Sequence, residues 1–90
     1  MKKVVYKYKL QLTKDIQEVI LPQGAQILCI KMQNDELCMW ALVDPDQTYD
    51  EVVKIRCAGT GHVVEEDIEC YIDTVMLLDG ALVFHFFKVK

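Results

Sequence analysis

The chain has 90 residues, of which 52% are hydrophobic and 27% are charged, and its formal net charge is −4. This length fits one domain, spanning residues 1–90, and the apolar content excludes intrinsic disorder, because disordered chains are poor in apolar residues. No apolar run approaches the ~20 residues of a membrane-spanning helix. Lysines, rather than an apolar stretch, follow Met1, which argues against a secretory signal peptide. We therefore expect no membrane partner.

Apolar and polar residues alternate along most of the chain, which is the pattern of half-buried strands. Turn-forming residues, such as those at Pro22-Gln23-Gly24 and Asp79-Gly80, separate the alternating segments. The expected strands are Val5–Leu12, Ile16–Leu21, Ile27–Met32, Leu37–Val43, Val52–Cys57, Tyr71–Leu78 and Ala81–Lys88. About seven short, mostly antiparallel strands predict an all-β fold, either a small single-domain sandwich or an open barrel.

The dipeptide Asn34-Asp35 predicts a two-residue hairpin turn between two of these strands. A turn centred there places Cys29 opposite Trp40 and Lys31 opposite Cys38. This register is a specific expectation of the sequence.

Two further segments carry structural expectations. Val52–Cys57 should face the core with Val53, Ile55 and Cys57, which turns Arg56 outward. Residues 64–70 could hold one helical turn, and the pattern leaves this open because so short a piece has no clear period.

Leu37–Val43 and Ala81–Phe87 are apolar on both faces. Strands buried on both faces lie inside layered cores, and a domain of this size has little interior. Another copy of the chain is the simplest cover, so we expect a homo-oligomer.

The cysteines and the charges limit the kinds of partner. Cys29, Cys38, Cys57 and Cys70 form no C-x-x-C pair, which disfavours a zinc site, and we expect four reduced thiols and no metal.

Lysines lie mainly toward the two ends of the chain, while acids fill the middle. With a single arginine the chain lacks the clustered Lys and Arg of a nucleic-acid-binding surface, so we expect no nucleic-acid polymer as a partner.

The segment Gly59-Thr60-Gly61-His62 is the best candidate for a ligand site. Its glycines permit backbone N–H groups to converge on an anion, and Arg56 lies three residues before it. A tight turn at a strand exit explains the same residues. Trp40 and Tyr71 are candidates for stacking on a ring, although Trp40 also suits the core.

No residue pattern indicates catalysis or a cofactor. The chain has no serine, and no feature selects a Cys–His pair. The acids of residues 44–51 lack the spacing of a calcium loop. His85 stands among phenylalanines and valines, which favours a hydrogen-bonded histidine of the core or of an interface over a ligand.

Five segments together resemble a family of short tailed-bacteriophage and prophage proteins, a domain of unknown function. They are Leu21-Pro22-Gln23-Gly24-Ala25-Gln26-Ile27-Leu28, Trp40-Ala41-Leu42-Val43-Asp44-Pro45, Gly59-Thr60-Gly61-His62, Tyr71-Ile72-Asp73-Thr74-Val75 and Leu82-Val83-Phe84-His85. The chain departs from the pattern at Asp73, where glycine is expected, and at Met39, where leucine is expected. The resemblance implies a small accessory phage protein made in the host bacterial cytoplasm.

These observations lead to one functional hypothesis with two alternatives. The protein is expected to be non-enzymatic and to inhibit host antiviral defence by sequestering a small anionic nucleotide-type signal. The phosphate would lie at Arg56 and the Gly59–His62 turn. Alternatively, the acidic surface binds a basic patch of a host protein, or the protein hydrolyses a nucleotide signal with His62 or Glu65 as the base.

Overall fold

The structure is a computed structural model that describes residues 2–90. It contains seven strands and no helix within this range: β1 (Val4–Lys9), β2 (Gln17–Pro22), β3 (Gln26–Gln33), β4 (Glu36–Val43), β5 (Tyr49–Gly59), β6 (Ile68–Leu77) and β7 (Leu82–Val89). The predicted all-β fold is confirmed. No part of residues 2–90 forms a helix that could cross a membrane.

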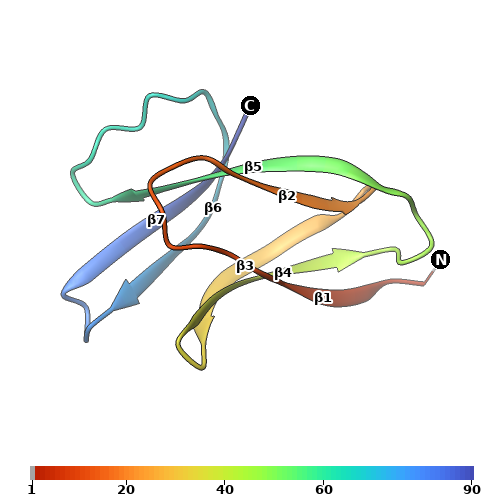
Figure 1. The fold of residues 1–90 in the computed structure, drawn as a ribbon, viewed down its shortest axis with the longest axis horizontal. Coiled ribbons are helices and arrows are strands. Elements are labelled where there is room, and N and C mark those ends of the chain that lie inside the picture. Colours follow the sequence, from red (N-terminus) through yellow and green to blue (C-terminus); the bar gives the residue numbers. More distant parts are fainter. Residues whose placement is uncertain (1) are drawn as a thin grey trace.

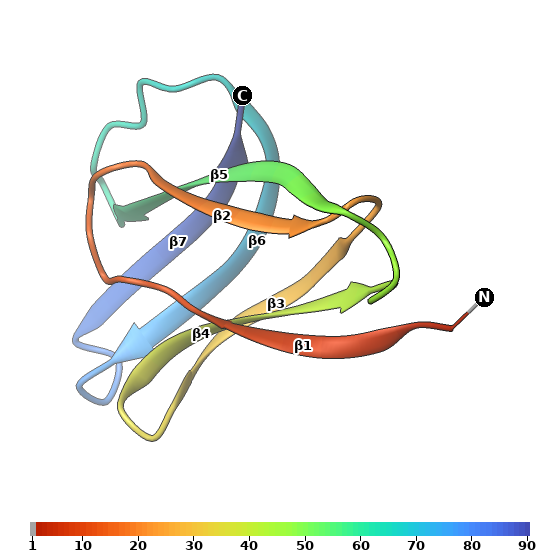
Figure 2. The ribbon, with the colours of Figure 1, turned by 45° about the vertical axis from the view of Figure 1, so that its right-hand side comes forward.

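The strands form two antiparallel sheets that pack face to face (Figures 1 and 2). The three-stranded sheet has the order β1-β4-β3, and the four-stranded sheet has the order β2-β5-β7-β6. Apolar side chains from the facing sides of both sheets build one core, in which Met39 of β4, Ile55 of β5 and Phe86 of β7 are fully buried. The predicted inward positions Val53, Ile55 and Cys57 all belong to this core.

The β3–β4 hairpin has the predicted register. Cys29 pairs with Trp40, and Lys31 pairs with Cys38. Asn34 and Asp35 both adopt positive φ, 50° and 63°, which matches a type I′ turn. The local turn chemistry therefore decides which residues of the two strands lie opposite each other.

The outward face of β4 is flanked by side chains of the same chain. Cys38 lies between Lys9 and Lys31 in the sheet, and Trp40 lies between Lys7 and Cys29. Cys38 is only 1% exposed. Long lysine side chains can lay their methylene groups over neighbouring apolar surface. Part of the apolar surface that led us to expect an oligomer is therefore covered within one chain.

The segment 60–67 connects two strands that flank β7. Because β5 and β6 are both antiparallel to β7, they run in the same direction, and the connection must return along the sheet. It does so without a helical turn: residues 62–65 have no regular structure, and β6 begins at Ile68. This crossover segment ends beside β7, where Lys90 N–H donates to Asp67 O at 3.0 Å, next to the Ile68–Val89 pair.

Candidate functional site

Arg56 holds two loops against the four-stranded sheet. Its Nε donates to Glu66 Oε1 at 2.9 Å, and Nη2 donates to Val63 O at 3.2 Å. Nη1 donates to Lys14 O at 2.8 Å and also to Cys57 O. The side chain is 14% exposed. The guanidinium therefore ties the crossover segment and the β1–β2 loop to β5.

The contacts around Glu66 change the pKa of its carboxyl group. The pKa of Glu66 is lowered, first by a hydrogen bond from its own backbone and then by the hydrogen bond from Arg56. Glu66 therefore stays ionised and bound to the guanidinium at neutral pH.

The Gly59–His62 segment is a tight turn at the end of β5. His62 N–H donates to Gly59 O at 3.0 Å, and Gly61 has a φ of 88°, as the third residue of a type II turn requires. Thr60 N–H donates to Val83 O at 3.4 Å. Two of the turn's amide donors are thus used inside the fold. An anion held by these amides and Arg56 would have to displace bonds that the protein makes to itself.

Gly59 has a packing role beside this turn. A Cβ built on Gly59 would lie 3.1 Å from His62 Nδ1, so the absence of a side chain allows the imidazole to rest against β5. The φ of Gly59 is not positive, and the position is therefore sensitive to added volume rather than to backbone strain.

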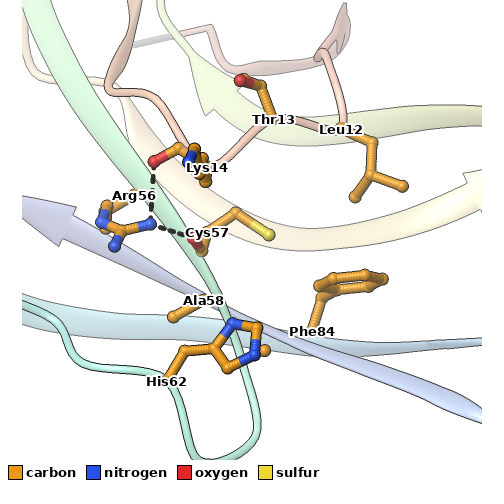
Figure 3. Close-up of a pocket in the computed structure, with 9 residues that line it drawn as sticks. Leu12, Thr13, Lys14, Arg56, Cys57, Ala58, His62 and Phe84 are labelled. Atoms are coloured by element: carbon orange, nitrogen blue, oxygen red, sulfur yellow. Dashed lines mark hydrogen bonds between the residues drawn. The ribbon is translucent and has the colours of Figure 1, made fainter.

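A hollow of about 370 Å³ opens at this end of the sandwich, between the β1–β2 loop and the strands β5 and β7. Figure 3 shows the Leu12 side chain, the Cys57 thiol and the Phe84 ring around it, with the His62 ring at its border. Burial raises the pKa of Cys57, although the nearby Arg56 acts in the opposite direction. The thiol is therefore protonated at neutral pH and acts as apolar lining.

Two of the residues that line the hollow carry polar side-chain groups without partners among the described residues. Within residues 2–90, the Lys14 ammonium makes no ion pair and the His62 imidazole makes no hydrogen bond. Both residues line the hollow together with Arg56. These two side chains, rather than the engaged guanidinium, are available to an anionic ligand. Lys14 was not a candidate from the sequence, because nothing in the pattern places the β1–β2 loop beside β5.

A second polar feature is a chain of hydrogen bonds on the outward face of β6 and β7. Tyr71 OH lies 2.7 Å from Thr74 Oγ1, which lies 3.1 Å from His85 Nδ1. His85 Nε2 lies 2.8 Å from Thr60 Oγ1. Sequence reasoning overlooked Thr74. A two-residue turn at Asp79-Gly80 would have placed Thr74 opposite His85, as the structure does.

The structure brings most of the predicted site residues together. Arg56, Gly59, Thr60, Gly61 and His62 lie at one end of β5, and hydrogen bonds connect Thr60 through His85 to Tyr71. Trp40 lies apart from them, half-buried on the outward face of the other sheet. A single small ligand cannot contact both groups.

Residues 2–90 contain no group of three His, Cys, Asp or Glu side chains arranged to hold a metal ion. Comparison with protein families matches residues 1–90 to a domain of unknown function, DUF7352. The chain belongs to this family. The match agrees with the resemblance to a domain-of-unknown-function family that the sequence segments indicate. No curated protein and no solved structure matches the chain at a significant level.

Proposed function

We propose that this DUF7352 protein is a non-enzymatic accessory protein of tailed bacteriophages, made in the host bacterial cytoplasm. It inhibits host antiviral defence by binding and sequestering a small anionic nucleotide-type signal. The phage setting rests on the five sequence segments. The ligand class rests on one observation, an apolar hollow lined in part by Lys14 and His62, whose ammonium and imidazole are unpaired within residues 2–90.

The dimensions and lining of the hollow support a small ligand. A volume of about 370 Å³ lies within the ~300–1,000 Å³ range of small-molecule sites, which are mostly apolar with a few polar groups. The Phe84 ring provides a flat apolar surface for a base or other ring, and the Leu12 side chain adds apolar contact. Lys14 and His62 supply donors for a phosphate. Arg56 contributes by fixing the loop that carries Lys14.

The experiment measures ligand depletion and recovery. Purified protein is incubated with cyclic nucleotides and ADP-ribose derivatives, the free ligand is quantified by filtration, and the protein is heat-denatured to release what it held. We expect at least one compound to be depleted and then recovered chemically intact. A chemically altered product would replace sequestration with hydrolysis. Depletion of none of the compounds would overturn the proposal in favour of a host-protein partner.

Variants locate the site. Lys14→Ala and His62→Ala should each weaken retention about ten- to a hundredfold, since a hydrogen bond to a charged group contributes roughly 1.5–3 kcal/mol. Lys54→Ala is the matched control, because Lys54 is an exposed lysine of β5 that does not line the hollow. Equal retention by Lys14→Ala, His62→Ala and Lys54→Ala would remove this hollow as the site.

A further inference from the structure

The outward side of the β6–β7 hairpin carries three cross-strand rows of side chains. Six residues form these rows, and we call them the hairpin face: Tyr71, Thr74 and Met76 of β6, and Phe87, His85 and Val83 of β7. Tyr71 is 57% exposed and Met76 is 65% exposed. None of the six is Asp, Glu, Lys or Arg. Interface cores have this composition, with Tyr and Met enriched and charged residues depleted.

The polar atoms at the centre of the hairpin face are already paired. Both ring nitrogens of His85 are bound to threonine hydroxyls, and Thr74 is bound in turn to Tyr71. Removing water from buried polar groups is costly only when it leaves them without partners. This face can therefore become dry in an interface without losing hydrogen bonds.

A contact between two rings and an exposed leucine add to the face. The Tyr71 ring meets the Phe87 ring edge to face, with centroids 6.0 Å apart. Beyond Met76, Leu78 in the hairpin turn is 74% exposed and has a φ of 52°, a conformation that leucine rarely adopts. The backbone thus holds the Leu78 side chain in solvent next to an apolar face. In an isolated monomer this exposed side chain contributes no buried apolar surface.

We propose that the hairpin face binds the hairpin face of a second copy of this chain. The absence of charged side chains on the face permits this occupant. Each chain carries a net charge of −4, so two copies repel each other overall, but a contact between two faces without Asp or Glu adds no close carboxylate–carboxylate repulsion. A partner recognised through the acidic or basic regions of the chain would bind elsewhere.

The order of the rows makes the face complementary to itself. Tyr71 and Met76 lie on either side of the Thr74–His85 row. A two-fold axis along that middle row reverses the strand direction and places Tyr71 of one copy against Met76 of the partner subunit, twice per dimer. Sulfur–aromatic contact of this kind is favourable.

The first test is the mass in solution, by light scattering at micromolar to millimolar concentration. We expect twice the chain mass of 10.4 kDa. Met76→Glu and Tyr71→Lys should each weaken the dimer at least about tenfold, because each places a charge in the dry interface. Ile20→Glu is the control, since Ile20 is 53% exposed on the same sheet but lies on β2. A monomer at every concentration, or equal effects of Met76→Glu and Ile20→Glu, would overturn the proposal.

A mixing experiment tests the two-fold arrangement itself. Combining the Tyr71→Lys chain with the Met76→Glu chain creates one Lys–Glu contact and keeps one native contact, so heterodimers should form where neither variant dimerises alone. Circular dichroism establishes that each variant keeps the β fold. Failure of two folded variants to associate when mixed would exclude the proposed pairing of Tyr71 with Met76. Ligand retention is measured separately, so its outcome and that of the dimer test are independent.

Discussion

Asp73 joins the two sheets at an edge where they share no backbone ladder. The residue lies on β6, and its Oδ2 accepts the Ile30 N–H of β3 at 2.9 Å. Oδ1 accepts the Thr74 N–H at 2.8 Å and the Lys31 ammonium at 3.2 Å. The carboxylate thus closes one side of the sandwich through a side chain. Asp73→Ala removes this connection and tests how much of the fold depends on it.

The expected loss of stability in Asp73→Ala follows from the donors that the carboxylate leaves without a partner. An amide N–H that loses its partner in a partly buried site costs about 1–3 kcal/mol, and an ion pair with an exposed lysine adds at most ~1 kcal/mol. Asp73→Ala should therefore lower the free energy of unfolding by about 2–3 kcal/mol, which corresponds to a fall in Tm of roughly 10–20 °C for a domain of this size. Asp73→Gly, which introduces the residue that the family resemblance leads us to expect, should cost at least as much.

The assay is urea unfolding of the wild type, Asp73→Ala, Asp73→Asn and Lys31→Met. Asp73→Asn keeps one carbonyl acceptor, so its free energy of unfolding should fall by only about 1 kcal/mol. Lys31→Met removes only the ion pair, so its loss should stay below ~1 kcal/mol. If Lys31→Met destabilised the protein as much as Asp73→Ala, the bond to Ile30 N–H would not be the important contact.

The pH dependence provides a second check on the same carboxylate. Burial alone raises the pKa of Asp73, but the Ile30 and Thr74 N–H groups and the Lys31 ammonium outweigh it, and the pKa is lowered overall. A lowered folded pKa contributes stability that is present above the unfolded value of about 3.9 and is lost as the pH falls through the folded value. The difference in free energy of unfolding between the wild type and Asp73→Asn should therefore become smaller below about pH 4. A gap that stays constant to pH 2 would refute this account of the carboxylate.

Two further predictions concern a turn and the thiols. Asp35→Gly should stabilise the protein by about 0.5–1 kcal/mol in urea unfolding, because Asp35 has a φ of 63° in a type I′ turn that favours Asn-Gly; a destabilised variant would contradict the turn assignment. In the folded protein, iodoacetamide should modify the exposed Cys70 and spare the buried Cys57, whose pKa burial raises, as peptide mass spectrometry can measure. Modification of both cysteines at the same rate would show that the hollow beside Cys57 opens readily.

The strands and one hairpin register could be predicted because both depend on local sequence. Alternation, or for β4 and β7 a continuous apolar run, identifies the seven strands, and Asn34-Asp35 fixes the pairing of Cys29 with Trp40. The predicted strand ends are less accurate. β5 begins at Tyr49 rather than Val52, because Tyr49 and Glu51 pair with β2 across a register shift, and this stretch does not alternate in polarity.

The candidate site was only partly predictable because its contacts come from segments without a period. Arg56 is expected to face outward, but the sequence does not show which loops it binds, because two of its acceptors are the backbone carbonyls of Lys14 and Val63, and every residue has a carbonyl. No sequence pattern distinguishes those two. Trp40 is proposed for the same site as Arg56 because an aromatic ring at a sheet face can stack on a ligand ring, whereas the strand order places the two residues on different sheets.

The position of β7 affects how the chain must fold. The last strand in the sequence is an interior strand of its sheet, between β5 and β6. Until β7 enters, β6 has no strand to pair with, and β5 has only β2. Such late, long-range pairing slows folding. During synthesis, the four-stranded sheet cannot assemble before residues 82–89 have been made, so a ribosome-bound intermediate lacking them exposes two open strand edges. Deletion of residues 82–89 should therefore prevent the four-stranded sheet from forming, whereas deletion of an edge strand would leave the other strands paired.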